Sequence, residues 1–155
     1  MQHHVITWKQ LHQDCMKIVE IIQQSNIEYD VVVGLMRGGC VPATIISHAL
    51  NVPMMTIGIK TYADQHKTQE VDAYQAAYGD FYNMRQRRSI MRTLIVDDLS
   101  DTGDTFAYVS RTYATVLPEI DTAAPYIKSH TTFKPKFYAT EFTNNEWLVF
   151  PWEAH

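Results

Sequence analysis

Hydrophobic residues early in the chain recur every three or four positions and therefore predict an α-helix. They are Leu11, Cys15, Ile18, Val19 and Ile22. Thr7 and Gln10 stand before them with the spacing of a capping box, the pair of side chains that closes the first turn of a helix. We expect the apolar face of this helix to pack on a sheet and to have no chemical role.

The next apolar segments are continuous, which is typical of strands that are buried on both faces. Tyr29–Leu35 and Met54–Ile59 are two predicted strands, separated by a turn at residues 36–39 and a short helix at Cys40–Leu50. A strand, a helix and a second strand in this order form a right-handed crossover between parallel strands. The pattern predicts an α/β fold with a mostly parallel sheet.

Residues 93–105 read TLIVDDLSDTGDT and carry the strongest functional signal. Thr93–Val96 suits a buried strand, Asp97 and Asp98 follow it, and a helix is predicted from Phe106 to about Thr115. The loop between them contains a third acid and small residues: Asp101, Thr102, Gly103, Asp104 and Thr105. Ligands of α/β sheets bind beyond the carboxyl ends of strands, and a helix N-terminus favours phosphate. We expect a hydroxyl-rich phosphosugar and a divalent metal here, the alternative being a solvated acidic turn.

The turn Met36-Arg37-Gly38-Gly39 is a second candidate site. Glycines allow the backbone to approach a ligand closely, and an arginine can hold a diphosphate through paired hydrogen bonds. Taken alone, such a turn is as often structural as functional. Its position after a parallel strand places it at the same edge of the sheet as the acidic loop, which strengthens the functional interpretation.

Composition limits the remaining possibilities. The chain has 155 residues, of which 46% are hydrophobic and 19% charged, as expected of one domain with a core. The net charge of −4 disfavours binding to nucleic acid. Cys15 and Cys40 lack the spacing of metal ligands, and we expect two buried thiols in a reducing cytoplasm. The sequence shows neither a signal peptide nor a long apolar run, so membrane insertion is not expected.

Together, the two loops resemble the signature of the type I phosphoribosyltransferases. The resemblance implies a central, mostly parallel sheet flanked by helices, with a small hood and a mobile loop. It implies that Asp97 and Asp98 face the ribose hydroxyls and Mg2+, and that Asp101–Thr105 wrap the 5-phosphate of 5-phosphoribosyl-1-diphosphate. The side chain of Asp104 should then point outward while its backbone N–H donates. The Arg37-Gly38-Gly39 loop would bind the diphosphate, in a family where this loop can carry a non-proline cis peptide.

The C-terminal part of the chain resembles one branch of this family, the xanthine-guanine phosphoribosyltransferases. Thr122–Ile127 is a predicted strand, and Lys128 at its end matches a lysine that contacts the 6-oxo group of the base. Trp147 matches an aromatic residue that stacks on the purine, and the carbonyls of Trp147 and Leu148 would accept from a 2-amino group. Glu153 matches an acid that helps to hold a second Mg2+ through water. Without the resemblance, Lys128 would be solvent-exposed and the aromatic residues part of the core.

We expect one domain over residues 1–155, with residues 129–155 as the base-binding segment. Residues 60–92 are polar and lack a sustained period, which is typical of a functional or partly disordered loop. The resemblance implies a mobile hood over the site, and a two-stranded hairpin with a basic turn is a compatible alternative. The basic residues of this stretch are Arg85, Arg87, Arg88 and Arg92. None of these arginines can be assigned to the diphosphate from the sequence.

The resemblance implies transfer of the 5-phosphoribosyl group to guanine, xanthine or hypoxanthine, with Asp101 as the acceptor of the proton from nitrogen 7 of the base. Two alternatives stay open: transfer to adenine or a pyrimidine, and a regulator that keeps the fold without catalysis. An intact acid pair argues against the regulator. Family members are commonly oligomers, so a homodimer or homotetramer is expected.

Overall fold

The fold was analysed in a computed structural model, which describes residues 1–62, 70–75, 92–117 and 119–153. Its elements follow one another along the chain as β1 (His3–Val5), α1 (Trp8–Ser25), β2 (Val31–Met36), α2 (Cys40–Leu50), β3 (Met54–Tyr62), β4 (Glu70–Gln75), β5 (Thr93–Val96), β6 (Leu99–Ser100), α4 (Asp104–Thr112), β7 (Ile120–Lys128), β8 (Phe137–Phe142) and β9 (Trp147–Val149). Among the described residues, no helix combines the length and the hydropathy needed to cross a membrane.

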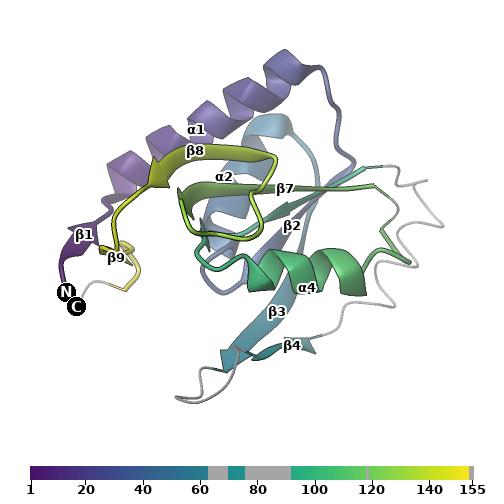
Figure 1. The fold of residues 1–155 in the computed structure, drawn as a ribbon. Coiled ribbons are helices and arrows are strands. Elements are labelled where there is room, and N and C mark those ends of the chain that lie inside the picture. The colour runs from purple at the N-terminus through teal and green to yellow at the C-terminus, as the bar shows by residue number, and fades with distance from the viewer. Residues whose placement is uncertain (63–69, 76–91, 118, 154–155) are drawn as a thin grey trace.

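A seven-stranded sheet forms the centre of the molecule (Figure 1). Its strands follow the order β4-β3-β2-β5-β7-β6, and β8 also pairs with β7. All of these pairs are parallel except β3 with β4. The α/β fold and the crossover through α2 are therefore confirmed.

Helices cover both faces of the sheet, and each face has its own apolar core. Side chains of α1 and α2 pack with alternate strand residues such as Val32, Leu94 and Val96. The intervening residues, including Val33 and Ile95, pack with α4 on the other face. This alternation follows from strand geometry, in which successive side chains point to opposite faces. It explains why these strands are apolar at every position.

Helix α1 begins where the sequence predicts, but only half of the capping box forms. The hydroxyl of Thr7 accepts from the backbone N–H of Gln10 at 3.1 Å. The side chain of Gln10 turns instead to Asp14. Asp14 is a fully buried acid on the apolar face, and it accepts from the hydroxyl of Tyr126 at 2.9 Å and from Lys17 at 2.9 Å. These partners offset the cost of burying its charge.

Several predicted boundaries shift by a few residues. Strand β2 begins at Val31 rather than Tyr29, and β7 runs over Ile120–Lys128, so that Lys128 is its last residue. Helix α4 begins at Asp104, within the predicted loop and before Phe106, and it ends at Thr112. The ends of elements are the part of a pattern least constrained by periodicity.

Part of the ambiguous stretch 60–92 is a hairpin. Strand β3 continues to Tyr62 and pairs antiparallel with β4, with Tyr62 opposite Glu70. Residues 63–69 and 76–91 lie outside the described residues, and with them Arg85, Arg87, Arg88 and the expectation of a mobile hood. Arg92 is described, and its Nε lies 3.1 Å from Oε2 of Glu119, at the amino end of β5.

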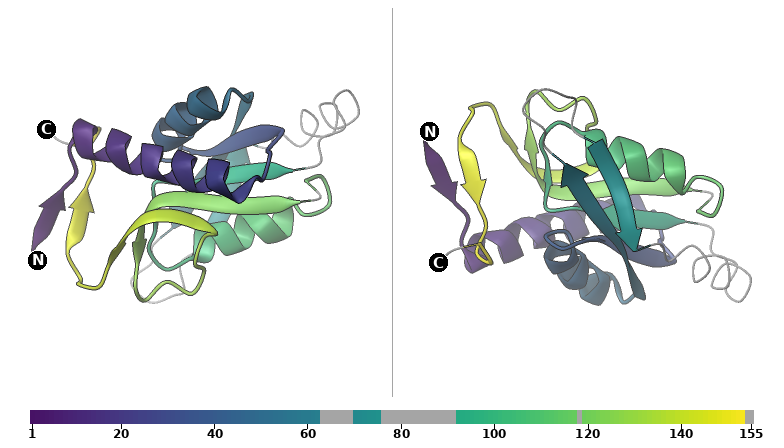
Figure 2. Two further views of the ribbon diagram at one scale, coloured as in Figure 1. Left: turned by 90° about the horizontal axis from the view of Figure 1, so that it is seen from above. Right: turned by 90° about the horizontal axis from the view of Figure 1, so that it is seen from below.

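The two ends of the described chain form a small separate sheet. Strand β1 pairs in parallel with β9, which brings His3 opposite Trp147 and His4 opposite Leu148. Both views of Figure 2 show these strands side by side at one end of the molecule. The N-terminal strand therefore supports the predicted base-binding segment.

Candidate functional site

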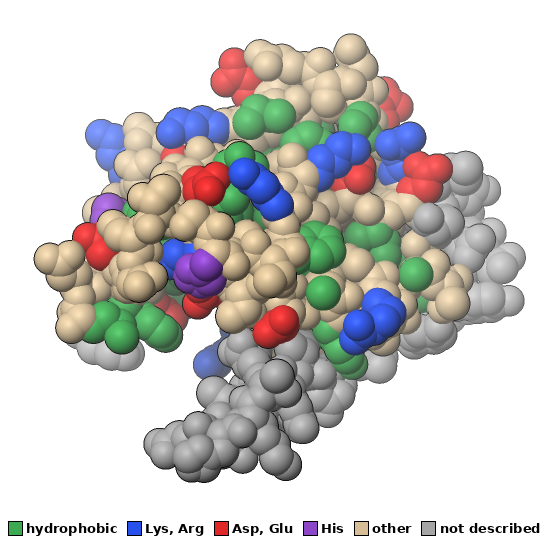
Figure 3. All heavy atoms as spheres, in the orientation of Figure 1, with side chains coloured by type: hydrophobic (Ala, Val, Ile, Leu, Met, Phe, Trp, Pro, Cys, Tyr) green, Lys and Arg blue, Asp and Glu red, His purple; other side chains and the backbone are tan. Residues whose placement is uncertain are grey.

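A cavity of about 530 Å3 opens beyond the carboxyl ends of β2, β5 and β7. Every predicted site residue except Gly39, Gly103 and Asp104 lines it. A second hollow, of about 1030 Å3, shares Arg37 and Asp98 with the first and extends toward Trp152. On the face seen in Figure 3, acidic, basic and histidine side chains gather around a recess. Residues predicted from separate parts of the sequence therefore lie together in one site.

Gly38 and Gly39 bring the turn after β2 against the acids after β5. A Cβ atom at Gly38 would lie 2.0 Å from Oδ2 of Asp98, and one at Gly39 would lie 2.6 Å from the carbonyl oxygen of Val96. Glycine is required at position 39, where the blocking atoms are backbone, whereas a side chain at position 38 would displace the carboxylate of Asp98. The peptide bond between Met36 and Arg37 is cis, a form that this loop can adopt in the family that the sequence resembles but that the sequence could not establish. The two predicted ligand-binding loops are therefore in direct contact.

Asp97 and Asp98 are adjacent carboxylates that are poorly solvated. Burial raises the pKa of Asp97 well above its usual range, and the charge of Asp98 raises it further. Burial raises the pKa of Asp98 to about 6, with a smaller contribution from the charge of Glu153, although hydrogen bonds that include one from Asp97 oppose the shift. Two acids in such a position favour a bound cation between them and a ligand.

Residues 101–105, the predicted phosphate cradle, comprise the loop between β6 and α4 and the first two residues of that helix. Gly103 has a φ of 94°, and a Cβ there would lie 2.5 Å from the backbone nitrogen of Phe133. Asp104 is exposed and accepts from the hydroxyl of Thr102 at 3.0 Å, while its own N–H lies 3.3 Å from the same oxygen. The outward orientation expected for Asp104 is confirmed. Its partner is Thr102, an exposed residue that lines the cavity.

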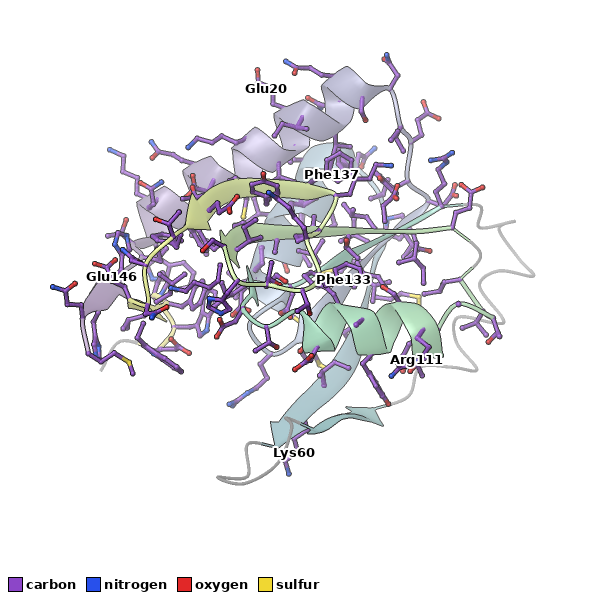
Figure 4. The ribbon with its side chains drawn as sticks, in the orientation of Figure 1. Glu20, Lys60, Arg111, Phe133, Phe137 and Glu146 are labelled. Carbon is purple, nitrogen blue, oxygen red and sulfur yellow. The ribbon has the colours of Figure 1, made fainter. Side chains whose placement is uncertain are left out.

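The connection between β7 and β8 runs beside this loop and holds it. Thr132 donates twice to the carbonyl of Thr102, from its N–H at 2.9 Å and from its hydroxyl at 2.8 Å. The ring of Phe133 stacks on Phe106 of α4 with 5.6 Å between centroids, and Figure 4 shows Phe133 above that helix. The first residues of the predicted base-binding segment thus contact the phosphate loop.

Lys128 is buried, with 4% of its surface exposed, so the solvent-exposed alternative is wrong. Its Nζ donates to the carbonyl of Glu146 and, at 3.4 Å, to that of Asn144, and it lies 5.4 Å from the centroid of Phe142. An ammonium group has three donors. One donor therefore remains for a ligand, while the other two fix the chain that precedes Trp147.

Trp147 is 56% exposed and lies on the cavity lining, whereas the side chain of Leu148 is buried. The N–H of Trp147 donates to Gln2, and Val149 accepts from Ile6. Backbone N–H and C=O groups alternate in direction along a strand, so those of Trp147 point toward β1. Of the two predicted carbonyl acceptors, only that of Leu148 points away from β1.

Glu153 lines both hollows, and its Oε2 accepts from the N–H of Phe150 at 3.0 Å. Within the described part of the chain, no three or more His, Cys, Asp or Glu side chains are grouped to hold a metal. Mg2+ is commonly bound by one or two carboxylates together with substrate oxygens and water. The pair Asp97 and Asp98 fits that pattern, with Glu153 near enough for its charge to raise the pKa of Asp98.

Sequence reasoning missed His130. Its Nε2 lies 2.8 Å from Oδ1 of Asp101, and both side chains are about half exposed, at 51% and 52%. An isolated histidine that is 29 positions from its partner matches no motif. Only its place two residues after Lys128, at the same edge of the sheet, could have indicated it.

Comparison with known proteins gives a consistent result. The sequence model of the phosphoribosyl transferase domain matches residues 7–155. A xanthine-guanine phosphoribosyltransferase from Cereibacter sphaeroides is 32% identical over 155 residues, covering 96% of this chain and 85% of the relative. One from Nitratidesulfovibrio vulgaris is 29% identical over 150 residues, covering 96% and 83%.

The fold comparison agrees with the sequence comparison. The crystal structure of a purine phosphoribosyltransferase from Pyrococcus horikoshii superimposes with a TM-score of 0.79 and 28% identity, covering 100% of this chain and 97% of that one. The shared fold extends over the sheet, the helices and the loops that form the cavity. With its acidic loop, its Arg-Gly-Gly turn and a family match over nearly its whole length, the chain belongs to the phosphoribosyltransferase family.

Proposed function

We propose that this protein transfers the 5-phosphoribosyl group of 5-phosphoribosyl-1-diphosphate to guanine, xanthine or hypoxanthine. The products are the nucleoside monophosphate and diphosphate, in the salvage of purines. One observation carries the proposal: the phosphate loop, the acid pair and the Lys128–Trp147 region line one cavity. The relatives' names support the purine, and the geometry supports the phosphosugar.

The phosphosugar is positioned by backbone as much as by side chains. The N-terminus of α4, with Thr102 and Thr105 on the cavity lining, suits the 5-phosphate. Arg37 lines the same cavity and suits the diphosphate, since its planar donors match phosphate oxygens. Asp97 and Asp98 also line it and suit the ribose hydroxyls.

We further propose that Mg2+ is required. Asp97 and Asp98 would hold it together with ribose and diphosphate oxygens, and Glu153 would contribute through water. When bound, the ion would neutralise the charge that develops on the departing diphosphate. Activity should disappear in excess chelator and return with added Mg2+, and binding of the phosphosugar, measured by calorimetry, should weaken in parallel.

The reaction forms one bond and breaks another at the anomeric carbon. Nitrogen 9 of the purine attacks that carbon, and the carbon–oxygen bond to diphosphate breaks with its electron pair on the leaving oxygen. The proton on nitrogen 7 passes to Asp101, which lines the cavity. The carboxylates of Asp97 and Asp98 complement the positive charge of the sugar in the transition state.

Base choice follows from Lys128 and Trp147. The free donor of Lys128 matches a 6-oxo group and is left without an acceptor by adenine, which costs about 1–3 kcal/mol. Stacking on Trp147 serves every purine alike. The carbonyl of Leu148 suits a 2-amino group, which favours guanine over hypoxanthine.

The test is diphosphate release with each base in turn, in the presence of the phosphosugar and Mg2+. We expect 6-oxopurines to exceed adenine by about ten- to a hundred-fold. Asp101→Asn should lower kcat by about 100-fold or more while the affinity for the phosphosugar changes little. Equal use of adenine or uracil would contradict the base assignment. Binding of the phosphosugar without diphosphate release from any base would support the regulator instead.

The variants Lys128→Met and Trp147→Ala separate the two parts of base recognition. Lys128→Met should reduce the preference for 6-oxopurines, whereas Trp147→Ala should raise the KM for all purines together. We also propose a homodimer or homotetramer in solution, which light scattering would test.

A further inference from the structure

His130 contacts Asp101 but has no role in the reaction proposed above. Its Nε2 lies 2.8 Å from Oδ1 of Asp101, a distance typical of a hydrogen bond between charged or polar groups. An ionised carboxylate can only accept. With Asp101 ionised, as its proposed role as proton acceptor requires, Nε2 of His130 is the donor and Oδ1 of Asp101 the acceptor.

The contact is built into the fold at both ends. Asp101 belongs to the loop that enters α4, and His130 lies in a turn closed by a hydrogen bond from the N–H of Thr131 to the carbonyl of Lys128 at 3.1 Å. Thr132, further along the same segment, is hydrogen-bonded to Thr102. His130 thus meets Asp101 from a segment whose backbone is already held against the loop, so the contact needs little additional ordering.

Both side chains line the cavity in which the base would react. We propose that His130 positions Asp101 for proton transfer. Its Nε2–H holds Oδ1, which orients the carboxylate and leaves Oδ2 to accept the proton from nitrogen 7 of the purine. This inference rests on the proposed function, because it assigns His130 a task only if Asp101 accepts that proton.

The hydrogen bond is compatible with the reactive state of Asp101. An ionised carboxylate accepts at both oxygens, so a donor on Oδ1 leaves Oδ2 able to take a proton. The same turn carries Lys128, the proposed partner of the 6-oxo group. One short segment would therefore fix the base through Lys128 and aim the proton acceptor through His130.

The test is a double-mutant cycle. His130→Ala should lower kcat about ten-fold, as expected when a reacting group loses its orientation, while the KM for the phosphosugar stays within about two-fold. His130→Gln keeps an N–H donor and should restore most of kcat. In the Asp101→Asn background, His130→Ala should have no further effect, because the group that it orients has already been lost. His12→Ala, an exposed histidine on α1 outside the cavity, is the matched control.

Three results would overturn the positioning role: an unchanged kcat in His130→Ala, an equal effect of that substitution in the Asp101→Asn background, or a raised KM for the phosphosugar with kcat preserved. The last result would assign His130 to the phosphate loop. Different results would reject the proposed function and the positioning role of His130. A drop in kcat with Asp101→Asn but none with His130→Ala rejects only the inference about His130. Full activity of Asp101→Asn, or a wild-type enzyme that uses no 6-oxopurine, rejects both.

Discussion

Glycine at position 103 is held by two independent constraints. Its φ of 94° lies in the left-handed region, which a residue with a Cβ rarely adopts. The space that a Cβ would fill is already taken by the backbone nitrogen of Phe133 at 2.5 Å and the hydroxyl of Thr131 at 2.9 Å. The sequence indicated only a small residue in the loop, but the neighbour that makes glycine necessary comes from a distant segment.

Gly103→Ala should therefore damage both stability and phosphate binding. The left-handed conformation alone costs about 1–3 kcal/mol for a residue with a Cβ, and the contact with Phe133 adds to it. We expect a lower free energy of unfolding in denaturant titrations and weaker binding of the phosphosugar by calorimetry. Ala107→Gly, in the middle of α4, is a control for a change in helix propensity without steric conflict. Wild-type phosphosugar affinity in Gly103→Ala would contradict the role of this close approach.

The acid pair should destabilise the ligand-free protein at neutral pH. Burial raises the pKa of Asp98 to about 6, above its value in an unfolded chain. The folded state then holds a proton that the unfolded state has already lost, so stability falls as the pH rises from about 4 to about 6. Above that range the full cost of holding the ionised Asp98 carboxylate in a buried position is present. Asp98→Asn removes this cost.

Asp98→Asn should raise the Tm of the ligand-free protein at pH 7.5 by about 2–4 °C, which corresponds to about 1 kcal/mol in a chain of this size. The gain should shrink at pH 5, and transferase activity should be lost. Glu20→Gln, on the outer face of α1 (Figure 4), is the control for loss of one acidic charge and should give no such pH-dependent gain. A Tm that falls at pH 7.5 would show that the Asp98 carboxylate stabilises the folded state.

At the scale of elements, β1 contributes to the site by holding β9, the strand that carries Trp147. Among the described strands, β1 pairs with β9 only. The backbone N–H and C=O of His4 point toward β9 and those of His3 and Val5 point away, because Gln2 and Ile6 bond to that strand. Trp147 is thereby held at the cavity by a strand from the other end of the chain. Periodicity gave no sign of β1, since three residues are too few to show a pattern.

His4→Pro should weaken base binding without affecting the phosphosugar. Proline removes the N–H that faces β9 and so loosens the position of Trp147. We expect a several-fold rise in the KM for guanine and an unchanged KM for 5-phosphoribosyl-1-diphosphate. His3→Pro controls for the proline itself, and His4→Ala controls for the ring, which contacts Phe142. If His3→Pro had the same effect as His4→Pro, pairing with β9 would not be the cause.

The elements show what could be predicted and what could not. Strands such as Thr93–Val96 and the helix Cys40–Leu50 were predictable because burial on both faces or on one stripe imposes a pattern on every residue. The phosphate and acid loops were predictable because their chemistry demands particular side chains at short spacing. The contact between His130 and Asp101 was not, because it depends on how β7 and β8 are connected, which no local pattern encodes.

At the scale of the whole molecule, two apolar cores lie on opposite faces of one sheet. Cys15 belongs to the core beneath α1, and burial raises the pKa of its thiol to about 12. Both cysteines are free, but the expectation of two buried thiols is correct only for Cys15, because Cys40 at the start of α2 is half-buried. Since the thiolate is the reactive form, Cys15 should be inert while the core is intact.

A thiol reagent should modify the native protein at Cys40 only. Cys15 should react at the rate of unfolding, as measured by stopped-flow or mass spectrometry after a pulse of reagent. Cys40→Ser should abolish the fast phase, and Cys15→Ser the slow one. Rapid native modification of Cys15 would mean that α1 separates from the sheet without global unfolding.

The hydrogen bond between Thr132 and Thr102 makes the connection between β7 and β8 a reporter of the site. The amide of Thr132 can exchange its hydrogen for deuterium only when the connection and the loop separate. Thr132 does not line the cavity, so a ligand cannot shield it by direct contact. Slower exchange at this one amide, on addition of the phosphosugar, would measure the free energy with which binding joins two segments that are 30 residues apart in the chain.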